Sequence, residues 1–89
     1  MHIWELTPVD PLDPDWEASS HQGRVVVRAN SEEDARDAAE KAFGLKTRFP
    51  PGGGVKAPPW KRPALVRADI IRDARFEEAG PVEVLFPAV

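Results

Sequence analysis

Hydrophobic and polar residues alternate along two short segments near the N-terminus. Residues 24–29 (RVVVRA) alternate strictly, which is typical of a strand, and residues 2–6 (HIWEL) form a shorter apolar run that also favours one. The two faces of segment 24–29 carry Val25, Val27 and Ala29 on one side and Arg24, Val26 and Arg28 on the other. Because two of its three side chains are charged, we expect the second face to be open to solvent or to a partner.

A period near 3.6 residues replaces this alternation between Ser31 and Gly44 and predicts an amphipathic helix. Ser31 is placed as the N-cap, Asp34 follows in a capping-box-like position, and Gly44 serves as a C′ residue that tolerates positive φ. The apolar stripe consists of Ala35, Ala38, Ala39 and Ala42, with Phe43 beside it. Such small side chains predict that the helix lies close against a sheet. On the polar face we expect the ion pairs Glu32–Arg36, Arg36–Glu40 and Asp37–Lys41.

Two further apolar runs lie near the C-terminus. Residues 64–73 (ALVRADIIRD) favour a strand, although a spacing of three between several apolar residues leaves a helix open. A Gly80-Pro81 turn precedes a last strand over residues 82–86 (VEVLF). In the first run Val66, Ala68 and Ile70 share one face, and Leu65 and Ile71 lie on the other, so burial on part of both sides stays open. In the second run we expect Val82, Val84 and Phe86 to point inward.

The elements follow the order β-β-α-β-β, and a chain of 89 residues forms one domain. We therefore predict a small α+β domain spanning residues 1–89, with an antiparallel or mixed sheet of about four strands and one helix packed on one face. A chain of this size buries only about 60–65% of the surface that its unfolded form exposes. Its core is therefore small and leaves no room for a deep internal active site.

Charge is distributed unevenly between two proline-rich connections. Residues 1–23 carry five acidic residues and no Lys or Arg, and within them we expect residues 7–23 to form an extended, polyproline-like connection, because proline lacks an amide donor. Residues 45–63 (LKTRFPPGGGVKAPPWKRP) carry five basic residues and no acidic one. We expect a long exposed loop there, although most connections have about 4–6 residues. The acidic and basic segments could simply face one another, or each could contact a partner.

Patterns typical of nucleophilic catalysis are weak. The chain has no cysteine, which excludes a disulfide, a thiol nucleophile and a thiolate metal site. His21 follows Ser19 and Ser20 directly, but residues so close in sequence seldom adopt the geometry of a catalytic triad. We therefore expect a protein without enzyme activity.

Patterns typical of metal or phosphate binding are also weak. Asp10, Asp13 and Asp15 alternate with prolines and lack the glycine and distal glutamate of a calcium-binding loop. The glycines at 52–54 precede Lys56, but Ala57, Pro58 and Pro59 follow it, where a phosphate-binding loop requires Ser or Thr and a helix. We therefore expect no cofactor and no metal.

The basic loop is the best candidate for a binding surface. It holds an aromatic residue and two cations in a stiff, proline-framed run, and Trp and Arg are frequent interface hot spots. We predict a small protein-interaction module (an adaptor, regulatory subunit or inhibitor of a larger assembly) that docks on an acidic protein surface through this loop. The candidate contact residues are Trp60, Lys61, Arg62, Lys56, Arg48 and Lys46. Trp60 could instead fold back into the core, because the chain has few large apolar side chains.

Two alternative functions stay open. The same loop could bind nucleic acid, although the pI near 5.3 is low for that class, or the domain could form a homodimer through an edge strand. Residues 1–20 lack the pattern of a signal peptide and no segment reaches the ~18 apolar residues of a membrane span, so we expect a cytoplasmic protein without a membrane partner. The strand ending in VRA and the SEEDARDAA helix resemble segments of many small bacterial proteins and imply no activity.

Overall fold

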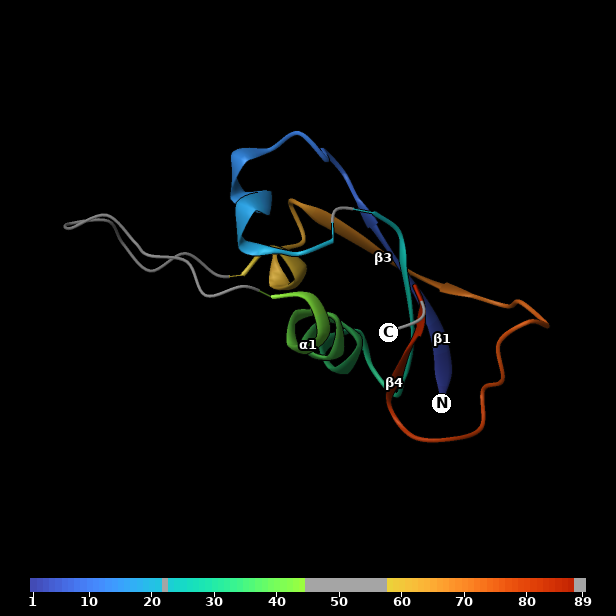
Figure 1. Cartoon of the computed structure of the whole chain (residues 1–89). Coiled ribbons are helices and arrows are strands. Elements are labelled where there is room, and N and C mark those ends of the chain that lie inside the picture. The colour runs from blue at the N-terminus through green and yellow to red at the C-terminus, as the bar shows by residue number, and fades with distance from the viewer. Residues whose placement is uncertain (22, 45–57, 88–89) are drawn as a thin grey trace.

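One antiparallel sheet and one α-helix make up the fold of the residues that the computed structural model describes, 1–21, 23–44 and 58–87 (Figure 1). The strands are β1 (His2–Pro8), β2 (Val25–Ala29), β3 (Val66–Ile71) and β4 (Glu83–Phe86), in the spatial order β3-β1-β2-β4. The α-helix is α1 (Glu32–Phe43), and two short 3-10 turns are η1 (Pro14–Ala18) and η2 (Pro59–Lys61). The predicted α+β class and the β-β-α-β-β order are confirmed, and all three strand pairings are antiparallel.

Helix α1 begins as the capping signals predict and packs on one face of the sheet (Figure 1). The Ser31 side chain accepts a hydrogen bond from the Asp34 backbone amide at 3.2 Å. Ala35 and Ala39 are fully buried, whereas Ala38 is half-buried and Ala42 is exposed. Ala35 and Ala39 are therefore part of the core, Ala38 packs against its margin, and Ala42 lies outside it.

The core on this side of the sheet combines β-branched residues of β2 with large aromatic side chains from the connections. Trp16 and Trp60 are fully buried and pack edge to face, with ring centroids 5.0 Å apart. The Phe43 ring lies 6.0 Å from that of Trp60. In a domain of this size, two buried tryptophans supply much of the apolar area that stabilises the fold.

The acidic connection contains a helical turn where the sequence predicted an extended segment, so that prediction is wrong. Pro14 occupies the first turn of η1, where its missing amide costs no hydrogen bond. Asp13 caps the turn by accepting from the Asp15 amide at 2.9 Å, and Trp16 Nε1 donates to the Asp10 carbonyl at 2.9 Å. The prolines therefore start a turn that carries Trp16 into the core.

The second face of β2 is covered at Arg28, contrary to the expectation that its arginines lie open, whereas Arg24 keeps 37% of its side chain exposed. Residues 72–82 cross this face on the side opposite α1 (Figure 1), and Arg28 keeps only 7% of its surface exposed. Its guanidinium donates to the carbonyls of Pro81 at 2.8 Å and Glu77 at 3.0 Å and to the Glu83 carboxylate at 2.9 Å. Gly80 has a φ of 129°, and an added Cβ would lie 2.8 Å from Arg28 Cζ. The backbone around Gly80 therefore packs closely against the Arg28 guanidinium.

The last strand differs from its predicted pattern at both ends. It begins at Glu83, which leaves Val82 outside the strand and 43% exposed. A register shift between Val26 and Val27 adds one residue on β4, so Val84 pairs with Val27 while Phe86 pairs with Val26. The Phe86 ring consequently lies near Arg24, 5.6 Å from Cζ, and the prediction that Phe86 points inward is wrong.

The end of α1 also differs from its prediction. Gly44 has φ −64° and ψ 137°, so it is an extended residue and not a left-handed one. A glycine is needed at this position because the Glu40 backbone lies close to it. An added Cβ would lie 2.6 Å from the Glu40 carbonyl oxygen. Ser19 and Gly44 form an isolated bridge at this point, which draws the end of the helix toward η1.

Candidate functional site

The basic loop is only partly within the described residues. Lys46, Arg48 and Lys56 fall in 45–57, outside the residues that the structure describes. Lys61 Nζ lies 2.6 Å from Asp37 Oδ1, and this bond raises the pKa of the Lys61 ammonium. Arg62 pairs with Asp15 of the acidic connection. At Arg62, the basic segment therefore faces the acidic segment, which is one of the two possibilities that the sequence left open.

Trp60 belongs to the core, the second of the two possibilities that the sequence left open. Its side chain has 0% of its surface exposed, and its Nε1 donates to Ser19 Oγ at 2.9 Å. A side chain without accessible surface cannot anchor a partner in this conformation. Lys61 and Arg62 beside it lie in ion pairs but stay partly exposed, so of the three candidate contact residues in the described part of the loop only Trp60 is withdrawn from the surface.

Ser19 and His21 do not pair as a nucleophile and a base. Ser19 Oγ donates to the backbone carbonyl of His21 at 2.7 Å and accepts from Trp60. A His21 ring nitrogen lies 3.2 Å from the Arg24 carbonyl, and the ring packs 5.1 Å from that of Phe43. Both side chains contribute to packing and to turn geometry.

The aspartates of the acidic connection are likewise occupied within the chain. Asp10 Oδ1 accepts from the Leu12 amide at 3.0 Å, and Asp13 caps η1. Across the described residues, no group of three or more His, Cys, Asp or Glu side chains is arranged to hold a metal ion.

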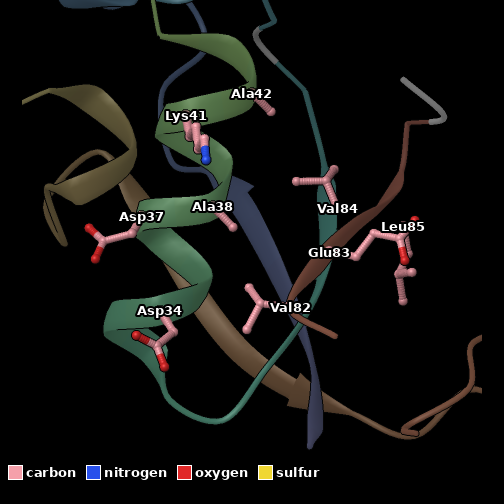
Figure 2. Close-up of a pocket in the computed structure, with 9 residues that line it drawn as sticks. All are labelled: Asp34, Asp37, Ala38, Lys41, Ala42, Val82, Glu83, Val84 and Leu85. Atoms are coloured by element: carbon pink, nitrogen blue, oxygen red, sulfur yellow. The ribbon is translucent and has the colours of Figure 1, made fainter. Parts of the chain in front are cut away.

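A groove of about 810 Å³ lies between α1 and β4 (Figure 2). Val82 and Val84 point toward the helix, and Ala38 and Ala42 point toward the strand. Because both alanines are small, the helix and the strand do not meet above the core, and the space between them stays open. The complete lining is Asp34, Asp37, Ala38, Lys41, Ala42, Val82, Glu83, Val84 and Leu85.

The helix wall of the groove is a regular stripe of one helix face. Asp34, Asp37, Ala38, Lys41 and Ala42 recur at i, i+3, i+4, i+7 and i+8, the spacing that places side chains on one side of an α-helix. The stripe is polar on its outer margin and apolar where it approaches β4. The alanines that the core does not use thus become the wall of a surface groove.

The strand wall of the groove is an open sheet edge. β4 pairs with β2 along one side, and no strand in the described part of the chain pairs with its other side. An edge strand presents unpaired backbone N–H and C=O groups, which can pair with another extended segment. The groove therefore combines main-chain hydrogen-bonding capacity with an apolar wall.

Two of the charges that line the groove are neutralised within the chain. Asp37 is held by Lys61 from η2, and Glu83 is held by Arg28 from the far face of the sheet. Nearby Glu40 is partly buried, and this desolvation raises the pKa of its carboxyl group. These pairings fix the helix and the edge strand on either side of the groove.

Sequence reasoning missed the groove, although one signal pointed toward it. The alanine stripe extends past the residues that are buried against the sheet, because Ala42 is exposed and Ala38 is only half-buried. An apolar stripe that extends past the core contact can indicate a second surface. The bulge in β4, which decides where Val84 and Phe86 point, has no comparable signal in the sequence.

The helices of the described residues give no evidence for a membrane-spanning segment, since none is long and apolar enough to cross a bilayer. No known protein family, no curated protein and no solved structure matches this chain. The groove between α1 and β4 is therefore the feature from which a function can be inferred.

Proposed function

We propose that the protein is a small interaction module that binds an extended segment of a partner protein in the groove between α1 and β4. The bound segment adds to the sheet as a strand beside β4. The observation that carries this proposal is the open edge of β4 next to an apolar groove wall. This proposal keeps the class of function predicted from the sequence and moves the binding site from the loop 45–63 to the groove.

Strand addition suits this site because the two walls supply different parts of the recognition. Backbone groups of β4 bind any extended segment, whereas alternate side chains of that segment point into the groove and determine specificity. The apolar side chains available to them are Ala38, Ala42, Val82 and Val84. The space suits side chains of the size of Val or Thr better than large aromatic ones.

The binding is expected to be weak and reversible. β4 has only four residues, so it offers few main-chain hydrogen bonds, and the added segment buries far less surface than a stable interface of ~1,600 Å². Dissociation constants in the micromolar range or above follow from such a small contact. This is the range typical of adaptors and regulatory subunits that exchange partners.

The proposal is tested by blocking the groove without disturbing the core. A library of ten-residue peptides displayed on phage is selected on the protein, and individual synthetic peptides are then titrated by fluorescence anisotropy. The blocking variant is Ala42→Trp, because Ala42 is exposed and lines the groove. The matched control is Ala74→Trp, which adds the same side chain at an exposed alanine in the loop on the opposite face.

Groove binding predicts that Ala42→Trp abolishes peptide binding while Ala74→Trp leaves it intact. Backbone amides of Glu83–Phe86 should also shift in NMR spectra as peptide is added. Peptides that bind equally to both variants and leave these amides unchanged would refute the groove as the site. The predictions for the basic loop, with an acidic protein surface or nucleic acid as partner, would then become the leading ones.

A further inference from the structure

Two charged side chains of the groove have no partner within the described residues. Asp34 and Lys41 are exposed and make no side-chain hydrogen bond or ion pair there. This distinguishes them from Asp37 and Glu83, whose carboxylates are held by Lys61 and Arg28. The groove therefore presents one available negative charge and one available positive charge.

These two charges lie at opposite ends of the helix wall. Seven residues separate them along α1, which corresponds to about 10.5 Å at a rise of ~1.5 Å per residue. Figure 2 shows Asp34 near the start of the helix, beside Val82, and Lys41 near its end, beside Ala42. An occupant of the groove meets a carboxylate at one end and an ammonium group at the other.

The spacing can be compared with that of an extended chain. Residues i, i+2 and i+4 of a strand point to the same face, and residues i and i+4 are about 13 Å apart. The difference of about 3 Å from the separation on α1 is within the reach of Lys, Arg or Glu side chains. Residue i+2 would then lie opposite Ala38, in the middle of the wall.

We propose that the groove selects an extended segment that runs in the same direction as α1, with a basic residue, an acidic residue four positions after it, and a small apolar residue between them. The basic residue pairs with Asp34, the acidic residue pairs with Lys41, and the apolar residue packs on Ala38. This inference rests on the proposed function, since it assumes a strand beside β4, and it adds the chemistry of the partner. Asp34 and Lys41 determine specificity, and the edge of β4 supplies the sequence-independent part of the binding.

The test uses four synthetic heptapeptides that differ only at two positions. Their common frame is acetyl-Thr-X-Thr-Val-Thr-Z-Thr-amide, with X and Z as Lys and Glu, Lys and Lys, Glu and Glu, or Gln and Gln. Affinities are measured by NMR titration of the β4 amides in low salt. Exposed ion pairs contribute about 0.2–1 kcal/mol each, so each correct charge should change affinity up to about fivefold. The Lys/Glu peptide should bind the protein most tightly.

Charge-changing variants should alter this preference in a defined way. Asp34→Lys should favour the Glu/Glu peptide, and Lys41→Glu should favour the Lys/Lys peptide. These expectations hold for either direction of the bound strand, because the two favoured peptides carry the same charge at both positions. Asp34→Asn is included because a cation in the first turn of a helix opposes the helix dipole. Glu33→Lys is the matched control, since Glu33 is exposed in the same turn and does not line the groove.

The outcomes separate this inference from the proposed function. The charge selection is supported if the protein prefers the Lys/Glu peptide. It also requires that this preference changes in Asp34→Lys and in Lys41→Glu but not in Glu33→Lys. Equal affinities for all four peptides, with shifts at the β4 amides, would overturn the charge selection and leave strand addition standing. No shift at these amides with any peptide, together with no effect of Ala42→Trp on selected binders, would overturn both.

Discussion

The guanidinium of Arg36 donates a hydrogen bond to the backbone carbonyl of Trp60 inside the core, with 3.1 Å between Nη1 and the oxygen. Its Nη2 donates to the carbonyl of Val66 at 2.9 Å. One side chain of α1 thus holds both η2 and the start of β3 in place. The sequence pattern placed Arg36 on the polar face, in ion pairs with Glu32 and Glu40. In the structure its Nη2 lies 3.6 Å from Glu32 Oε1, which is longer than its two hydrogen bonds to the carbonyls.

Replacement of Arg36 by an apolar residue should destabilise the fold strongly. Arg36→Met leaves two carbonyl oxygens without their donor, and each unsatisfied buried group costs about 1–3 kcal/mol. We expect the free energy of unfolding to fall by about 2–5 kcal/mol in urea denaturation. The exposed Arg72→Met is the control and should change it by less than about 0.5 kcal/mol. A loss below about 1 kcal/mol for Arg36→Met would mean that water replaces the guanidinium.

Trp60 and its two basic neighbours should respond differently to truncation. Trp60→Ala removes a fully buried indole and should cost about 3–5 kcal/mol of stability, whether or not a partner is present. Lys61→Ala and Arg62→Ala remove partly exposed ion pairs, whose loss should change the stability far less than the loss of the indole. The melting temperatures of the three variants, measured by circular dichroism, distinguish these effects. A folded Trp60→Ala variant with unchanged stability would return Trp60 to the candidate contact residues.

Gly44→Ala should destabilise the protein through a steric conflict with Glu40. An added Cβ would lie 2.1 Å from Glu40 Oε1 and 2.6 Å from the Glu40 carbonyl oxygen. We expect a loss of about 1–3 kcal/mol, as in other overpacked sites. The combination with Glu40→Ala removes only the side-chain conflict, so it should recover part of the loss. Full recovery would show that the backbone contact relaxes without cost.

The stability of the protein should depend on pH through Glu40. Burial raises the pKa of its carboxyl group above the ordinary value of 4.5, while the nearby Lys61 opposes this shift. The folded state therefore binds the proton more tightly than the unfolded state, and stability is lost as pH rises from about 4.5 through the folded-state pKa. Glu40→Gln removes this loss, so its stability relative to the wild type should increase between pH 3 and pH 7. The exposed Glu33→Gln should show no such increase, and an identical trend in both variants would contradict this assignment.

The local signals in the sequence were sufficient for the class of fold and the order of its elements. Ser31 caps α1, as predicted, and β2 forms where the sequence favoured a strand. These features depend on residues close together in the chain, where capping and periodicity act directly. In β3 the face that starts with the buried Val66 ends with Ile70, which is 53% exposed. The helical alternative for residues 64–73 is excluded by the six-residue strand β3.

The sequence could not supply the contacts made between distant segments. Arg28 appeared on a face expected to be open, because its acceptors at Glu77 and Pro81 lie about fifty positions further along the chain. Lys61 pairs with Asp37, whereas local spacing favoured Lys41 as the partner of Asp37. Because Lys61 pairs with Asp37, the Lys41 ammonium group at the groove has no ion-pair partner within the described residues. Tertiary packing decides such pairings, and periodicity within one segment contains no information about them.

The position of Arg28 joins the start of β4 to the loop before it. The Glu83 carboxylate, which points away from α1 in Figure 2, is bound by the same guanidinium that holds the carbonyls of Glu77 and Pro81. The first residue of β4 cannot shift without disturbing the loop behind it. A change at Glu77 or Pro81 that displaces the Arg28 guanidinium would therefore also release the Glu83 carboxylate at the start of β4.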